Sequence, residues 1–283
     1  MSRPQKQCIF CDNPANSKEH FWPEWMHELL PQLPDPRHNR MLKEYHPKTG
    51  LMESGLKDRP GGIETIKIRV VCDTCNSGWM NRLEKEARPF ITPLINGDPI
   101  ALDVFQMTVV ARWIALKCIV AEHSNPDYEL TPRADRMALR DGIIPAYYRV
   151  YLINHTIAHG IGYMRHSLGL SLSPDLGPIP NPPPWGTPKN VQTVSFFLGR
   201  IMVHLNASRI DDYSIESRYL IPEVWDQCRI WPFQNLRMVW PRRPLLDETG
   251  VATVATALAE IMAVSDLVWQ DPVRTPRGTP LVE

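Results

Sequence analysis

Residues 63–84 read IETIKIRVVCDTCNSGWMNRLE, and this stretch decides how the N-terminal part of the chain folds. Over residues 63–71, β-branched side chains alternate with polar ones, which predicts a strand. Asp73 or Thr74 then offers an N-cap, so we expect a helix that continues to about Ala87, before a proline. The stretch therefore predicts a strand that leads into a helix, with a Cys-x-x-Cys unit at the junction.

Four of the six cysteines form two pairs with the same spacing, Cys8-x-x-Cys11 and Cys72-x-x-Cys75. Thiolates at this spacing can bind one tetrahedral ion at about 2.3 Å, so the two pairs predict a structural zinc with four thiolate ligands. One alternative is four reduced structural cysteines, which would leave the repeated spacing a coincidence. Another is a redox motif, which needs only one pair.

The composition is typical of a globular protein with a sizeable core. The 283 residues are 43% hydrophobic and 22% charged, and 31 basic residues balance 31 acidic ones. This balance excludes a polybasic nucleic-acid-binding protein or an acidic tail protein, but not a local basic groove. Gln106, Arg112 and Lys117 interrupt the most apolar segment, and no secretory signal is visible, so we expect a cytoplasmic protein that spans no membrane. Cys118 and Cys228 stand in apolar surroundings and are expected to be buried.

The hydrophobic pattern of the whole chain predicts an α+β fold. Helices are expected near 24–30 and at 101–123, 131–141 and 248–263, and strands at 16–22, 146–154 and 191–205. Seven prolines between 173 and 188 predict an extended surface loop. We place a domain boundary between residues 97 and 98, so that residues 1–97 form the cysteine-bearing module and residues 98–283 a larger α+β domain of unknown role.

Three polar residues and a proline accompany the cysteine pairs. Glu19 and His20 follow the first pair, with Pro23 close behind, and Asn76 comes directly after the second pair. With the two Cys-x-x-Cys units, these residues resemble the HNH endonucleases, also called ββα-metal or His-Me finger nucleases. The resemblance covers residues 8–88 only. It implies a small zinc-stapled ββα-metal module, which here precedes a larger mixed α/β domain of unknown fold.

The resemblance also implies a role for each residue. Glu19 and Asn76 would bind a catalytic divalent cation, Mg²⁺ or Mn²⁺, and His20 would be the general base. The substrate would be DNA, cleaved by water to leave 5′-phosphate and 3′-hydroxyl ends. The chain departs from the family pattern in having Glu where Asp is commoner, in a long insertion before the second cysteine pair, and in lacking a clear middle Asn. Asn39 in the insertion is one candidate for that position.

The chemistry of these residues suits phosphodiester hydrolysis. A neutral imidazole can take a proton from water near pH 7, and a hard cation with oxygen ligands suits the leaving oxygen. Zinc on four thiolates has no open position, so its role would be structural. The side chains of Arg69, Arg82, Lys85 and Arg88 could contact phosphates without reading bases, or could simply be solvated charges among acidic neighbours.

The alternative to a nuclease is a protein without catalytic activity. Glu19-His20 could be a surface ion pair beside a structural zinc, and the protein would then be a non-catalytic zinc-binding module that mediates nucleic-acid or protein contacts. The balanced net charge slightly favours this alternative. Tryptophans such as Trp25 and Trp79 could stack on bases, although tryptophan in a small module is more often a core residue. Target specificity and oligomeric state are not readable from these patterns.

Overall fold

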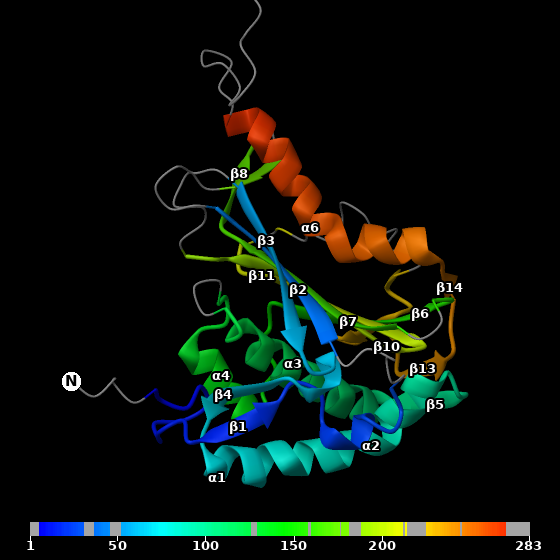
Figure 1. Ribbon diagram of the computed structural model, residues 1–283. Coiled ribbons are helices and arrows are strands. Elements are labelled where there is room, and N and C mark those ends of the chain that lie inside the picture. The colour runs from blue at the N-terminus through cyan, green and yellow to red at the C-terminus, as the bar shows by residue number, and fades with distance from the viewer. Residues whose placement is uncertain are drawn as a thin grey trace, which may run out of the picture.

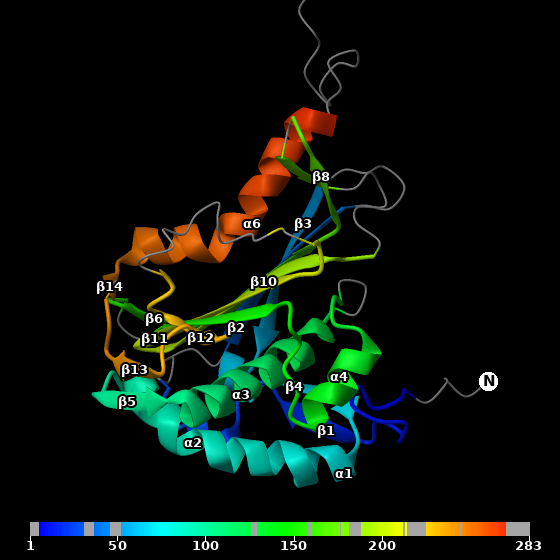
Figure 2. The ribbon, with the colours of Figure 1, turned by 180° about the vertical axis from the view of Figure 1, so that it is seen from behind.

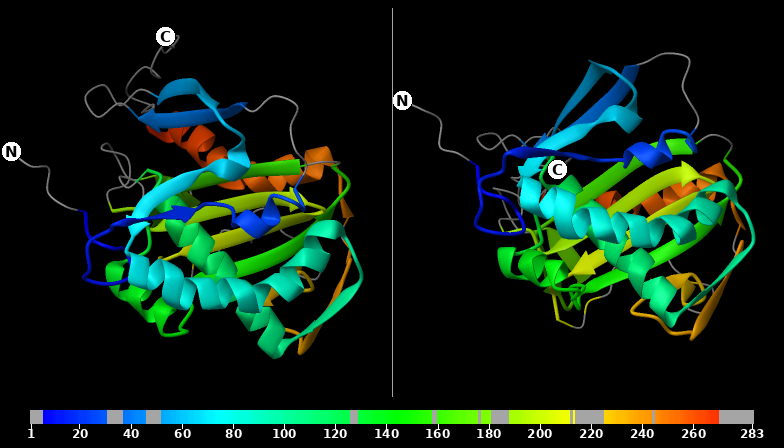
Figure 3. Two further views of the ribbon diagram at one scale, coloured as in Figure 1. Left: turned by 60° about the horizontal axis from the view of Figure 1, so that its bottom comes forward. Right: turned by 90° about the horizontal axis from the view of Figure 1, so that it is seen from below.

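The structure is a computed structural model, and it describes residues 6–30, 37–45, 52–125, 129–157, 160–175, 177–180, 188–211, 213, 225–243 and 245–269. It confirms the α+β class. A central sheet separates two helical layers, with helices α2 and α3 on one side and helix α6 on the other (Figures 1 and 2). The N-terminal strands β1 and β4 lie on the α2 side of the molecule (Figure 3).

The central sheet has six strands, of which five follow the order β12-β6-β11-β10-β7, while β14 pairs with β6. The strands are β6 (Tyr148–His155), β7 (Gly160–Leu168), β10 (Val191–Gly199), β11 (Ile201–Ser208), β12 (Arg229–Trp231) and β14 (Leu245–Leu246). All pairings are antiparallel except that of β14 with β6. Alternating apolar side chains of β6, β10 and β11 form the core on the α3 side.

Residues 191–205, which the sequence pattern predicts to be one strand, are instead part of a hairpin formed by β10 and β11. The chain reverses at Gly199, whose φ of +60° lies in the left-handed region that glycine tolerates. A Cβ at this position would meet the carbonyl oxygen of Ile95 at 2.4 Å. The adjacent Arg200 N–H donates to that same oxygen at 2.8 Å, so this turn packs against the end of α2.

Helix α3 (Val104–Glu122) crosses the centre of the molecule. Asp103 and Gln106 form a reciprocal capping box at its N-terminus. By length and apolar composition alone α3 could cross a membrane, but 72% of its apolar window is buried inside the protein. Its apolar character is therefore explained by packing between the sheet and α2. Two further helices in the described part of the chain are α4 (Arg133–Arg140) and α6 (Glu248–Trp269).

The first half of the chain contributes strand β1 (Ser17–His20), which pairs antiparallel with β4 (Lys67–Val71). Residues 63–65 form a 3-10 turn (η2, Ile63–Thr65), so β4 is shorter than the predicted strand. A second 3-10 turn (η1, Glu24–Met26) stands where the short helix near 24–30 was expected. The insertion forms a hairpin of β2 (Arg37–Tyr45) and β3 (Met52–Pro60). Asn39 lies on β2, and its side chain is outside the described part of the structure.

Beyond β4 the chain forms α1 (Asp73–Cys75), a π-type turn (η3, Asn76–Met80) and α2 (Asn81–Asn96), with a kink at Gly78, whose backbone angles are not helical. The predicted end near Ala87 is wrong, because α2 continues through two prolines and ends at Gly97 with φ +81°. The apolar face of α2 continues past the prolines into buried Ile91, Leu94 and Ile95, and this burial against α3 offsets the lost hydrogen bonds.

The remaining strands form two small pairs. Strand β5 (Ile100–Asp103) pairs with β13 (Arg237–Trp240), and β8 (Leu170–Ser173) pairs with β9 (Gly177–Pro180). The second pair corrects the expected loop at 173–188, because its proline-bearing segment supplies a strand. Proline is tolerated in a two-stranded pair, where one edge of each strand needs no partner. Residues 181–187 of the expected loop lie outside the described residues.

Buried side chains from both sides of the predicted boundary at 97/98 form one hydrophobic cluster. It joins Phe10 and Trp22 in the first part to Trp113, Phe196 and Trp240 in the second. Phe21 and Trp22 make edge-to-face contacts with Phe196 of the central sheet, at centroid distances of 5.9 and 5.2 Å. The two-domain division stays a prediction, and in this structure the proposed module shares its core with the sheet.

Candidate functional site

The two Cys-x-x-Cys units meet in space. The four sulfur atoms of Cys8, Cys11, Cys72 and Cys75 all lie within 4.8 Å of one another. The sulfur of Cys11 is 3.5 Å from that of Cys72 and 3.7 Å from that of Cys75. Four sulfurs bound to one tetrahedral ion at 2.3 Å would lie about 3.8 Å apart. The four sulfurs are therefore close enough together to bind a metal ion such as zinc.

Backbone amides donate to two of the four sulfur atoms, and the pKa of one cysteine, Cys72, is lowered. The amide of Phe10 donates to the Cys8 sulfur at 3.5 Å, and the amide of Cys75 donates to the Cys72 sulfur at 3.3 Å. Burial raises the pKa of Cys72, but these amide and thiol hydrogen bonds bring it to about 7. Burial raises the pKa of Cys8 and Cys75. A bound cation would offset that burial penalty, as metal sites do for their thiolate ligands.

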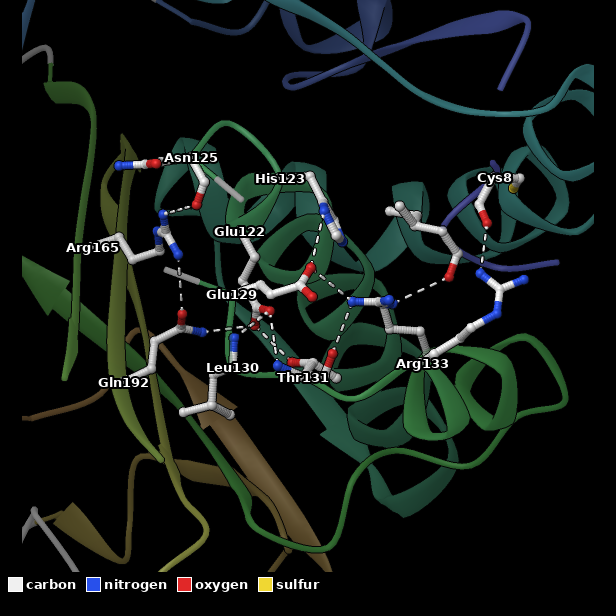
Figure 4. Close-up of polar contacts among 12 residues, drawn as sticks. Cys8, Glu122, His123, Asn125, Glu129, Leu130, Thr131, Arg133, Arg165 and Gln192 are labelled. Carbon is white, nitrogen blue, oxygen red and sulfur yellow. Dashed lines mark hydrogen bonds and ion pairs between the residues drawn. The ribbon is translucent and has the colours of Figure 1, made fainter. Parts of the chain in front are cut away.

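Two arginines of α4 hold the first cysteine pair from outside the proposed module. Arg133 donates to the carbonyl oxygen of Cys8 at 3.1 Å (Figure 4) and to that of Cys11 at 2.7 Å. Arg136 donates to the carbonyl oxygen of Ile9 at 3.2 Å. These charge-assisted bonds fix the turn that presents the two sulfurs. The geometry of the cluster thus depends on residues beyond position 97.

Glu122, a buried carboxylate at the end of α3, binds the backbone of residues 130–131, which precede α4. Glu122 accepts hydrogen bonds from the backbone amides of Leu130 and Thr131 at 3.1 and 3.0 Å and from the side chain of Gln192 at 2.9 Å (Figure 4). A buried charge is tolerated when such donors satisfy it. A continuous polar network therefore runs from strand β10 through α3 to the cysteine cluster.

A cleft of about 340 Å³ opens beside the four-cysteine cluster. All three residues that the sequence singled out for catalysis, Glu19, His20 and Asn76, line it. Glu19 and His20 come from the end of β1, and Asn76 from the start of the helical segment that follows β4. The pairing of β1 with β4 brings them together. The cleft lining consists of Glu19, His20, Pro23, Glu24, Trp25, Asp73, Asn76, Ser77, Asn81 and Glu84.

The lining is acidic. Four of its side chains are carboxylates, and no lysine or arginine is among the lining residues of this cleft. The four carboxylates outnumber the two ammonium groups that contact them, those of Lys117 and Lys67, so the cleft disfavours a phosphate group until a further cation is bound there. Carboxylate and amide oxygens are ligands that Mg²⁺ accepts, so the chemistry of the lining fits a hard divalent cation.

His20 is half-buried, and its Nε2 atom lies 3.0 Å from Oε1 of Glu24. Burial and the nearby Lys67 ammonium lower the pKa of His20 below its ordinary value of 6.5, although Glu24 and Glu19 oppose this shift. The imidazole is therefore neutral at pH 7 and able to accept a proton. Glu24 is thus the residue in contact with the His20 ring, whereas the sequence offered Asn39 as a candidate for the middle Asn of the family pattern.

Asn76 is anchored to β1 through its amide nitrogen. This nitrogen donates to the hydroxyl oxygen of Ser17 at 2.9 Å and to the carbonyl oxygen of Lys18 at 3.3 Å. With the nitrogen engaged in this way, the side-chain oxygen is the atom of Asn76 suited to contact a cation. The contact also holds the start of the helix against the strand that carries Glu19.

Glu19 is almost completely buried and is paired with a residue that sequence reasoning missed. The Nζ atom of Lys117, on α3, lies 2.6 Å from Oε1 of Glu19 and 2.6 Å from Oε1 of Glu84, on α2. Burial alone would lower the pKa of Lys117, but the two carboxylates raise it above its ordinary value, so the ammonium is charged. One signal could have revealed it, namely a lone lysine in a strongly apolar helix.

The four residues predicted to contact phosphates lie outside the cleft lining. Arg82 and Lys85 are exposed on α2, and Arg69 donates to the carbonyl oxygen of Asn16 at 3.1 Å. The guanidinium of Arg88 lies 5.4 Å from the ring centroid of Trp25, a cleft residue. Of the four, Arg88 is therefore the one tied to the cleft, and the phosphate-binding role stays a prediction.

The two unpaired cysteines and two of the tryptophans differ in how deeply they are buried. Cys118 and Cys228 are buried, as expected. Trp79 lies in the hydrophobic core as a structural residue, whereas Trp25 is only partly buried and lines the cleft.

Comparisons with known proteins add no assignment. No family model matches the chain, and neither a curated protein nor a solved structure matches it. The resemblance to HNH endonucleases therefore rests on the residues and their arrangement alone.

Proposed function

We propose that this protein is a metal-dependent endonuclease of the HNH type that hydrolyses phosphodiester bonds in DNA. The observation that carries the proposal is the convergence of Glu19, His20 and Asn76 on one open cleft beside the four-cysteine cluster. Glu19 and His20 are more than fifty positions from Asn76 in the chain, and local structure alone would not bring them together. Two antiparallel strands followed by a helix also agree with the ββα-metal module that the resemblance implies.

In this proposal His20 takes the proton from the attacking water. Its Nε2 atom is buried and faces Glu24, which leaves Nδ1 as the ring nitrogen for the water. Glu19 and Asn76 would hold a divalent cation, Mg²⁺ or Mn²⁺, which when bound supplies positive charge for the scissile phosphate and the leaving oxygen. The acidic lining supports this role, because without a further cation the cleft would disfavour DNA.

The four-cysteine cluster would bind zinc in a structural role. Four thiolates fill a tetrahedral site, so no position would be left for water or substrate. Zinc there would join the first knuckle to the junction of β4 and the helix, and so hold Glu19 and His20 opposite Asn76.

The rival function is a non-catalytic zinc-binding module that mediates nucleic-acid or protein contacts. One observation favours it: the cleft lining carries four carboxylates and no lysine or arginine, which is unusual for a surface that meets DNA. In that case Glu19 would serve only as a buried partner of Lys117, and His20 only as a partner of Glu24.

A plasmid-nicking assay separates the two functions. Wild-type protein with Mg²⁺ or Mn²⁺ should nick supercoiled DNA, and His20→Ala should lower the rate by about 10²–10⁴-fold, the usual contribution of a general base. The matched control is His27→Ala, because His27 is also half-buried and its ring lies 6.4 Å from that of His20 but is not part of the cleft lining. Full cleavage by folded His20→Ala protein would exclude this mechanism, and no cleavage by wild type would favour the rival.

A further inference from the structure

Lys117 is the most deeply buried charged residue near the cleft. Its side chain is 1% exposed and lies in α3, where its neighbours Leu116 and Cys118 are fully buried. Lysine is almost never fully buried unless it is paired, and an isolated ammonium in this position would carry a large desolvation cost. Its location therefore calls for an explanation in terms of what it contacts.

The ammonium makes three polar contacts, which equals its number of N–H donors. Two are the contacts at 2.6 Å with Oε1 of Glu19 and Oε1 of Glu84. The third is a hydrogen bond to the backbone carbonyl oxygen of His20 at 3.2 Å. One side chain from α3 therefore holds both the carboxylate of Glu19 and the backbone of the residue proposed as the general base.

Each carboxylate offers Lys117 only its Oε1 atom, and both Glu19 and Glu84 belong to the cleft lining. Two carboxylates held this close in a poorly solvated place would repel each other without a cation between them. The Lys117 ammonium, which contacts both carboxylates, offsets this repulsion. It also limits the rotation of Glu19, because moving that carboxylate would leave a buried ammonium without a partner.

We propose that Lys117 is a positioning residue of the proposed active site. It holds Glu19 and the backbone of His20 in their working geometry, and Glu84 in turn holds the ammonium in place. This inference rests on the proposed function and extends it beyond residues 8–88, the part that resembles HNH endonucleases. The site would then be completed by a helix that lies outside the zinc-bound module.

The test measures Mn²⁺ binding to the full-length, zinc-loaded protein by electron paramagnetic resonance, together with kcat and KM for plasmid nicking. Lys117→Met and Glu84→Ala should each weaken Mn²⁺ binding by about 10–100-fold, the usual effect of losing a residue that orients a metal ligand. They should lower kcat more than they raise KM for DNA. The matched control is Glu86→Ala, which removes an exposed carboxylate two residues from Glu84 on α2.

Zinc content and circular dichroism show which variants fold. If Lys117→Met does not fold, Glu84→Ala decides the outcome, because Glu84 is only partly buried. Unchanged or tighter Mn²⁺ binding in a folded variant would overturn the inference, since Lys117 would then act only as a counter-charge. If the wild type binds Mn²⁺ and cuts DNA while the variants do the same, the inference alone fails. If the wild type does neither, the proposed function fails and the inference fails with it.

Discussion

Replacing Cys72 by serine should destabilise the whole chain and not just its first third. Cys72 is buried in the four-cysteine cluster, and loss of one thiolate should release the metal. Structural zinc contributes on the order of 10 kcal/mol to the folding of small modules. A typical domain is stable by only about 5–15 kcal/mol, so this loss is large enough to unfold it.

The contacts of α4 couple the stability of the cysteine module to that of the rest of the protein. Arg133 and Arg136 make three hydrogen bonds to carbonyl oxygens of the first cysteine pair. Hydrogen bonds from charged groups contribute at least about 1.5 kcal/mol each, so the three together contribute at least about 4–5 kcal/mol. Because Phe21 and Trp22 also pack on Phe196, unfolding of the cysteine module should remove stability from the central sheet.

We therefore expect Cys72→Ser to lose zinc and to unfold in a single transition at a much lower temperature. Calorimetry and hydrogen exchange of β10 and β11 would measure this. The matched control is Cys228→Ser, because Cys228 is equally buried but lies outside the cluster, and it should keep its zinc. Two separate transitions, with normal protection of β10 and β11 in Cys72→Ser, would refute the shared-core reasoning and support a boundary at 97/98.

Two further predictions concern the cation and pH. Glu19→Gln and Asn76→Ala should reduce cleavage, and a raised Mn²⁺ concentration should partly restore it, because both residues act through the cation. Cleavage by His20→Ala should not respond to Mn²⁺. Equal rescue of all three variants in a metal titration would contradict the assigned roles. Burial lowers the pKa of His204 to about 3, so below pH 6.5 the unfolded chain takes up a proton that the folded chain does not. Stability should therefore fall as pH drops from 6.5 towards 4, by about 1.4 kcal/mol per pH unit from this residue. Urea unfolding of wild type and His204→Gln would measure it, and identical slopes would exclude the effect.

Local sequence patterns were sufficient for the secondary structure that depends on near neighbours. The alternation of apolar residues predicted β4 and the apolar helical pattern predicted α3, and the structure confirms both elements, although α3 is buried on nearly all sides. The spacing of the cysteines also predicted a four-sulfur cluster, because ligand spacing within each pair is a local property. Glu19, His20 and Asn76 were singled out by the resemblance to HNH endonucleases, and the structure places all three along one cleft.

Local rules failed where distant contacts outweighed them. Prolines predicted the end of a helix near Ala87, but α2 continues because its far end is buried against α3. A run of strand-forming residues concealed the turn at Gly199, which is set by the close approach of the Ile95 carbonyl.

The sequence by itself determined the α+β class, the four-cysteine cluster and the three residues proposed for catalysis. Only the tertiary structure revealed that Lys117 contacts Glu19 and that arginines of α4 hold the first cysteine pair. These partners are about a hundred or more positions apart in the chain, and no periodicity or spacing links them. Buried ionic contacts of this kind form only once packing has excluded water around both groups, so the folded arrangement of β1, α3 and α4 decides them.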